Sequence, residues 1–258
     1  MRLYWSYIKM HFRSQLQYRS AFFLLILGQF ITSFSALLSI WFLLRRFHEI
    51  DGFSFSEVLL CFAAVLMAFS LAELFVRGFD QFSSLIRRGD FDRILVRPRS
   101  AMLQVLGAKM EFSRIGRLLQ AVCVFCYAIP VSGVHWTPDR ILLLLLMIIG
   151  GTVVFAGLFV IYAALCFFTT EGLEFINIFT DGGREFGAYP LSVYGRSILQ
   201  FFTFVVPLAL VQYYPLLYLT GRSDSLLCLL SPLAAFLFLI PCYLLWRLGV
   251  RHYTSTGS

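Results

Sequence analysis

Six long runs of apolar residues divide the chain, and short charged segments separate them. Each run holds 17 to 30 residues, which brackets the ~20 that a helix needs to cross a bilayer. No run shows the alternation of barrel strands, and backbone groups in lipid need internal hydrogen bonds, so each run is predicted to be helical. The pattern predicts an all-α integral membrane protein. Its six predicted transmembrane helices are Ala21–Leu44, Val58–Val76, Leu118–Val134, Ile141–Thr170, Ser197–Gly221 and Ser225–Trp246.

The first 20 residues have a different pattern. Two sets recur at helical spacing on different faces, the apolar Trp5, Ile8, Phe12 and Leu16 and the polar Arg2, Ser6, Lys9 and Arg13. Residues 1–20 are therefore predicted to form an amphipathic helix in the membrane interface, with its cationic side toward the headgroups. The apolar run that follows is too long for the core of a cleavable signal, so we expect it to remain in the protein.

Composition and charge support a membrane class and an orientation. Apolar residues make up 59% of the chain and charged residues 14%, whereas soluble domains have roughly 45–50% and 25%. Seventeen of the 21 Lys and Arg residues lie before span one, between spans two and three, between spans four and five, or after span six. By the positive-inside rule, both termini are predicted to be cytoplasmic. Residues 1–258 then form one transmembrane domain, with cytoplasmic segments at 77–117 and 171–196.

Chemistry inside the spans is sparse. Glu73 is the one charged residue within a predicted span, and Arg77 follows it by four residues, so a pair on one helix face is favoured over a proton relay. Cys123 and Cys126 form a C-x-x-C in an apolar run. A role as small, buried hydrophobic side chains is favoured over a metal or redox site. The excess of Lys and Arg over acidic residues lies beside the spans, which favours an orientation signal over nucleic-acid binding.

Nothing in the sequence predicts a nucleotide site. Both lysines, Lys9 and Lys109, are followed by Met, so the chain lacks the phosphate-binding loop G-x-x-x-x-G-K-[ST]. The four histidines lie in different segments and predict no metal site. No nucleophile elbow occurs either. The chain is therefore not predicted to be an enzyme or to bind a cofactor, and any ATP would be bound by another chain.

The loop after the second span concentrates charge. Seven of the thirteen residues from Arg87 to Arg99 are charged. Before them, Phe82, Leu85 and Ile86 follow helical spacing, and Gly89 can end a short helix in the left-handed conformation. Two interpretations stay open, a solvated loop that fixes orientation and a rigid docking element for a cytosolic partner. The second is favoured, because orientation alone needs neither apolar side chains nor patterned acids.

Two motifs resemble those of ABC-2-type exporter permeases. "IRRGDFDRILVRP" (Ile86–Pro98) resembles the family's loop between spans two and three, and "GAYPLSVYGRSILQFFTFVVPLALVQYYPLLYLTG" (Gly187–Gly221) resembles its second signature. The order of features matches along nearly all of the chain. The resemblance implies that Ser83–Gly89 is a coupling helix seated in an ATPase subunit. It implies these coupling residues: Phe82, Leu85, Ile86, Arg87, Arg88, Gly89, Asp90 and Asp92.

The resemblance also implies a function. The chain would be the permease subunit of an ATP-binding cassette exporter in a bacterial cytoplasmic (inner) membrane, working by alternating access. Its partners would be two ATPase subunits, which carry ATP and Mg, and a second permease chain, identical or homologous. The alternative is a stand-alone membrane protein, such as a scramblase or an assembly factor, without an ATPase. The substrate is not predicted.

The segment Glu171–Arg196 is acidic, although it is predicted to be cytoplasmic. Two interpretations stay open, a second contact with the ATPase and internal pairing with the basic residues of Arg77–Arg117. Its glycines, Gly182, Gly183 and Gly187, are expected in a loop turn or, less commonly, a hinge.

Overall fold

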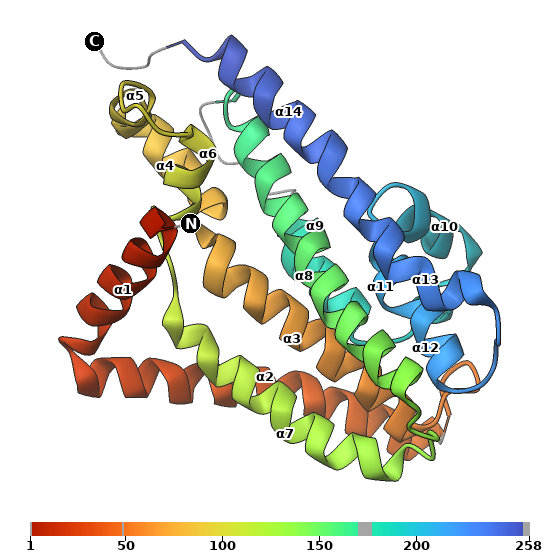
Figure 1. Ribbon diagram of the computed structural model, residues 1–258. Coiled ribbons are helices and arrows are strands. Elements are labelled where there is room, and N and C mark those ends of the chain that lie inside the picture. The colour runs from red at the N-terminus through yellow and green to blue at the C-terminus, as the bar shows by residue number, and fades with distance from the viewer. Residues whose placement is uncertain (1, 48, 170–176, 255–258) are drawn as a thin grey trace.

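The computed structural model describes residues 2–47, 49–169 and 177–254, and this part of the chain is helical, without a β-strand (Figure 1). The α-helices are α1 (Arg2–Leu16), α2 (Arg19–Phe47), α3 (Phe55–Asp80), α4 (Phe82–Arg87), α5 (Asp90–Leu95), α6 (Ala101–Leu106), α7 (Ile115–Val131), α8 (Pro138–Leu165), α9 (Asn177–Gly187), α10 (Arg196–Phe204), α11 (Leu208–Val211), α12 (Tyr213–Leu219), α13 (Leu226–Ala234) and α14 (Leu239–His252). Short 3-10 turns are η1 (Phe112–Arg114), η3 (Leu191–Tyr194) and η4 (Ala235–Phe238).

Five of the predicted spans appear as helices long and apolar enough to cross a membrane. These are Arg19–Phe47, Phe55–Arg87, Phe112–Val131, Pro138–Leu165 and Leu226–His252. Each contains or nearly contains the predicted run, and the end of the fourth run, Thr170, lies outside the described residues. The chain is therefore a multi-pass membrane protein.

The fifth predicted span is bent instead of straight. Its two parts, α10 and α11–α12, meet at an angle of 86° and count as a sixth crossing only if taken together. Pro207 directly precedes α11 and has no N–H to continue a helix. Gln212, only 1% exposed, donates from its amide to the carbonyls of Gly187 (3.3 Å) and Tyr189 (2.6 Å). A buried side chain thus satisfies backbone oxygens near the break, as an apolar environment requires.

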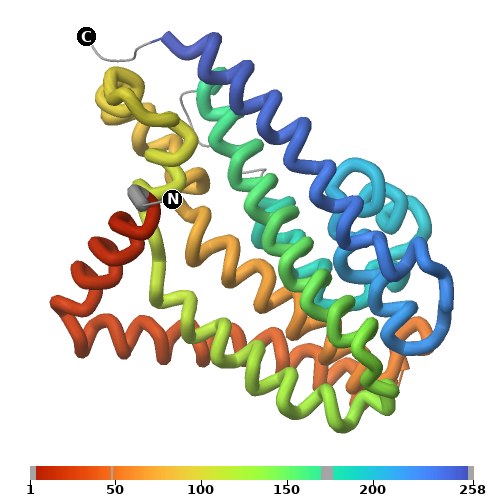
Figure 2. The backbone as a smooth tube through the Cα atoms, viewed as in Figure 1, coloured from red at the N-terminus to blue at the C-terminus, as the bar shows by residue number. Residues whose placement is uncertain are grey.

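The helix α3 is the core of the bundle. In its most apolar stretch 83% of the residues are buried inside the protein, whereas in that of α2 only 11% are buried. It packs against α7 on one side and α8 on the other, while α2 lies beyond α7 and α14 beyond α8 (Figures 1 and 2). In Figure 2 the C-terminal ends of α3, α8 and α14 lie toward one end of the bundle, where α4–α6 also lie. We call this end of the bundle the α4–α6 end.

The helix α9 corrects one expectation. Gly182, Gly183 and Gly187 lie within this helix and not in a turn or hinge. A Cβ on Gly187 would stand 3.0 Å from Val65, and one on Gly183 would stand 3.2 Å from Leu208. These glycines therefore let α9 pack closely against its neighbours. Most of the predicted second cytoplasmic segment that is described packs into the bundle, while Glu171 and Glu174 lie outside the described residues.

Within the predicted interfacial segment 1–20, the helix α1 covers Arg2–Leu16 and docks onto the protein through one edge. Tyr4 donates a hydrogen bond to the carbonyl of Phe75 (3.0 Å), and Gln15 donates to that of Met110 (2.8 Å). Burial raises the pKa of the Tyr4 phenol to about 12. Trp5 stays 60% exposed and Phe12 39%. The helix thus keeps Trp5 largely exposed, packs Phe12 edge-on against Phe112 with 5.2 Å between ring centroids, and holds the loop that follows α6 with its other edge.

Close packing of α6 on α3 yields a stability prediction. A Cβ on Gly78 would stand 1.9 Å from the carbonyl oxygen of Val105, and a backbone atom cannot rotate away. We expect Gly78→Ala to destabilise the fold by roughly 1–3 kcal/mol, because α6 must shift. The measurement is the thermal unfolding temperature in detergent. Gly28→Ala is the matched control, since nothing lies within 4 Å of its Cβ. An equal effect at both positions would contradict this packing.

Candidate functional site

A buried carboxylate organises the α4–α6 end of the bundle. Glu73 on α3 is 2% exposed, and its oxygens lie 3.1 Å from Arg77, 3.2 Å from Arg114 and 2.6 Å from Arg117. The expected Glu73–Arg77 pair is therefore confirmed, but it is one of three. Arg114 lies in η1 and Arg117 in α7, 41 and 44 residues after Glu73 in the sequence. The carboxylate of Glu73 therefore joins α3 to the start of the next span.

Further charges extend this group, which we call the charge cluster. Its members are Glu73, Arg77, Asp80, Lys109, Glu111, Arg114 and Arg117. Arg114 also donates to the side-chain oxygen of Gln29 on α2 (2.9 Å). Burial raises the pKa of Glu111, but Arg77, Arg114 and Lys109 together hold it below the ordinary value. Glu111 thus contributes stability that is present above the ordinary Glu pKa and is lost as the pH falls through the lowered one.

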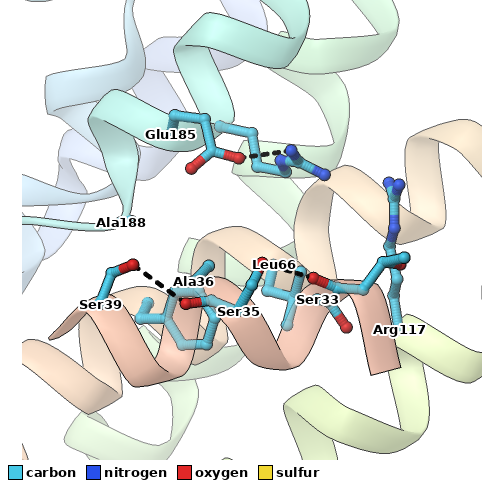
Figure 3. A pocket seen from close by; sticks show the side chains of 11 residues that line it. Ser33, Ser35, Ala36, Ser39, Leu66, Arg117, Glu185 and Ala188 are labelled. Carbon is cyan, nitrogen blue, oxygen red and sulfur yellow. Dashed lines mark hydrogen bonds and ion pairs between the residues drawn. The ribbon is translucent and has the colours of Figure 1, made fainter. Parts of the chain in front are cut away.

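A cavity of about 220 Å³ lies beside the charge cluster. Arg117 lines it, together with Arg184 and Glu185 of α9 and a row of hydroxyl side chains on α2: Thr32, Ser33, Ser35 and Ser39. Figure 3 shows Glu185 on one side of the cavity and Ser35 and Ser39 on the other. We call it the polar cavity. The sequence analysis did not single it out, although hydroxyls clustered in the apolar first span were a visible signal.

The polar cavity offers both donors and acceptors. Ser35 donates its proton to the carbonyl of Thr32 (2.7 Å) and Ser39 donates to that of Ser35 (3.0 Å), so their lone pairs stay available to a ligand. Arg184 pairs with Glu185, and its guanidinium lies 5.2 Å from the Phe69 ring centroid. Ionisable groups at such positions between apolar spans are costly and usually serve a function.

The charged loop is broken at Gly89 as predicted, but several of its apolar side chains face the protein's own core. Gly89 adopts a left-handed φ of 69° between α4 and α5, as predicted. The expected helix Ser83–Gly89 corresponds to α4, Phe82–Arg87. Phe82 is 0% exposed and Ile86 is 1% exposed, so these two expected coupling residues point into the chain's own core. Leu85 is only partly buried.

An aromatic cluster explains the burial of Phe82. Its ring centroid lies 5.1 Å from Phe91 of α5, 4.9 Å from Phe167 and 5.2 Å from Trp246 of α14. Phe79 also contacts Trp246 at 5.3 Å. Each such pair adds about 0.5–1.5 kcal/mol beyond the area that it buries. The aromatic cluster thus fixes α4 and α5 to the segment after α8 and to α14.

The outer side of the loop is left uncovered. Arg87 and Arg88 are exposed, whereas Asp90 and Asp92 are partly buried, and Asp90 lies 3.7 Å from Arg93. At the end of α5, Leu95 is 42% exposed and Val96, which follows it, is 82% exposed. We call the exposed set the loop surface: Arg87, Arg88, Arg93, Leu95 and Val96. Leu95 and Val96 were not predicted as contact residues from the sequence, although both lie within the motif Ile86–Pro98.

Comparison with known proteins gives one match. A family model described as ABC-2 family transporter protein matches residues 30–257 of the 258-residue chain. No curated protein and no solved structure matches. The matched region contains the charge cluster, the polar cavity and the loop surface.

The charge cluster predicts a large cost for losing its central acid. Glu73→Gln removes the ion-pair partner of Arg117 and one of the partners of Arg77 and of Arg114, so we expect a loss of about 3–5 kcal/mol in stability. Thermal unfolding in detergent at neutral pH measures it. The matched control is Asp90→Asn, which removes an exposed pair and should cost at most about 1 kcal/mol. Similar unfolding temperatures for the two variants would show that the charge cluster does not hold α3 to α7.

Proposed function

The chain belongs to the ABC-2 transporter family, and we propose that it is the permease subunit of an ATP-binding cassette exporter. ATP would be bound and hydrolysed by two separate ATPase subunits, because this sequence lacks the phosphate-binding loop. The observation that carries the proposal is the loop surface, which presents Arg87, Arg88, Leu95 and Val96 on a rigid support. The proposed complex lies in a bacterial cytoplasmic membrane, with both termini and the α4–α6 end in the cytoplasm.

The loop surface fits a docking role better than a solvated loop. Paired basic groups beside an exposed aliphatic pair provide both register and buried area to a partner. The inner side of the same loop packs into the aromatic cluster, so a displacement of the loop is passed to α14 and to the end of α8. This arrangement supports a coupling element, in which Arg87, Arg88, Asp90 and Asp92 contact the ATPase while Phe82 and Ile86 transmit its movement.

The polar cavity supports a transport path. It lies between α2, α3, α7 and α9, and it offers hydroxyl oxygens and charged groups where the surrounding helices are apolar. Such groups suit the polar part of a substrate. Thr32 and Ser35 are also exposed on α2, and hydroxyls on an outer face favour a second permease chain there over lipid. We propose that the cavity opens alternately to the two sides of the membrane.

The ATPase partner is tested by copurification. We expect the chain in mild detergent to copurify with a nucleotide-binding protein, best supplied by coexpressing a neighbouring ATPase gene. Replacing Arg87, Arg88, Asp90 and Asp92 together by Ala should reduce the bound ATPase at least about tenfold, since four charged contacts of the loop are removed together. Val96→Asp should act in the same direction without unfolding the protein.

The matched control is Arg45→Ala with Arg46→Ala, two exposed arginines at the other end of α2. If the unaltered chain retains no nucleotide-binding protein, the exporter proposal fails and the stand-alone alternative gains support. If the altered loop still binds the ATPase normally, the exporter proposal stands but the loop surface is the wrong contact.

Alternating access is tested by labelling within the polar cavity. In a chain with Cys123 and Cys126 replaced by Ser, Ser35→Cys should react with a membrane-impermeant maleimide added from the cytoplasmic side. We expect slower labelling when a hydrolysis-deficient ATPase holds ATP, because the cavity then closes to that side. Glu49→Cys, at the opposite end of α2, should stay unlabelled in both states. Equal rates at Ser35→Cys with and without ATP would contradict the proposed movement.

A further inference from the structure

A second basic site lies at the α4–α6 end, apart from the loop surface. A groove of about 340 Å³ runs between the start of α6 and the last turns of α14. Met102 forms part of one wall, and Tyr243, Arg247, Val250 and Arg251 form the other. The last four recur at helical spacing on α14, so they share one face of that helix. One face thus carries two cations together with apolar surface.

The two arginines in this groove have no carboxylate partner among the residues that the structure describes. Arg247 and Arg251 are exposed, and neither forms an ion pair with a carboxylate anywhere in residues 2–47, 49–169 and 177–254. The loop acid Asp90 is paired with Arg93. No acidic residue lines the groove. It therefore presents two positive charges four residues apart, in contrast to the charge cluster, where acids and bases are paired.

The position of the groove is fixed by the aromatic cluster. Trp246, the residue before Arg247, is 4% exposed and contacts Phe82, Phe79 and Phe167 at 5.2–5.3 Å between ring centroids. The arginines therefore sit at a set place relative to the loop and to the end of an apolar helix. Tyr243 is 51% exposed beside them, as expected for an aromatic side chain at a membrane interface.

We propose that this groove binds an anionic phospholipid, with Arg247 and Arg251 on the headgroup phosphate. Guanidinium groups match phosphate oxygens in geometry and charge. The apolar wall of Met102, Val250 and Tyr243 then receives the upper part of an acyl chain, which free phosphate lacks. Because Met102 belongs to α6, the bound lipid joins the segment after the charged loop to α14. The inference depends on α14 crossing the membrane and not on the ATPase partner.

The test uses photo-crosslinking of the full chain in lipid nanodiscs. The probes are phosphatidylglycerol and phosphatidylcholine with the same diazirine-bearing acyl chain. We expect the anionic probe to label the peptide around Tyr243 and Val250 several-fold more than the zwitterionic one. Arg247→Gln with Arg251→Gln should abolish this preference, whereas Arg247→Lys with Arg251→Lys should keep most of it. Arg45→Gln with Arg46→Gln is the control and should keep it fully.

Three results would overturn the proposal. One is equal labelling by the two probes in the unaltered chain, which does not depend on any variant folding. Another is displacement of the lipid by millimolar inorganic phosphate, which would identify a free-anion site. The third is an unchanged lipid preference in the Gln variant together with loss of copurifying ATPase, which would make the groove a protein contact. The labelling is measured on a preparation without ATPase. A preference for the anionic probe there supports the lipid site whether or not the exporter proposal holds.

Discussion

One buried carboxylate carries much of this architecture. A charge in the interior of an apolar bundle is tolerated only with partners, and Glu73 has three of them. Through Arg114 and Arg117 it fixes the start of α7 against α3, and through Arg114 and Gln29 it reaches α2. Arg117 also lines the polar cavity. The fold of three spans and the shape of the cavity therefore depend on the same ion pairs.

The charged loop combines two surfaces with opposite requirements. Its inner face is dry and aromatic, and Phe82 and Phe91 lock it to Trp246. Its outer face is wet, basic and partly aliphatic, with Val96 almost fully exposed at 82%. A coupling element needs both, because a partner can move the bundle only through a contact that does not yield. The lipid groove adds a third connection to the same part of α14, made by the membrane itself.

The sequence predicted the features that local chemistry determines. Run length placed the five long spans, i,i+4 spacing placed the Glu73–Arg77 pair, and glycine placed the left-handed turn at Gly89. It failed where distant segments decide. Periodicity gave Phe82 and Ile86 an apolar face but could not show that Phe167 and Trp246 cover it. Likewise, the glycines of α9 were predicted in a turn or hinge because periodicity could not show their close neighbours, Val65 at Gly187 and Leu208 at Gly183, which lie on other helices.

The bent fifth crossing differs mechanically from the others. A straight helix such as α8 acts as a rod, so a push at one end arrives at the other as a translation. A chain bent by 86° between α10 and α11 converts the same push into a rotation at its corner. Gln212, between α11 and α12, donates to the carbonyls of Gly187 at the end of α9 and of Tyr189 just after it. Movement delivered to this crossing would therefore turn α9, and with it the charged wall of the polar cavity, instead of sliding it.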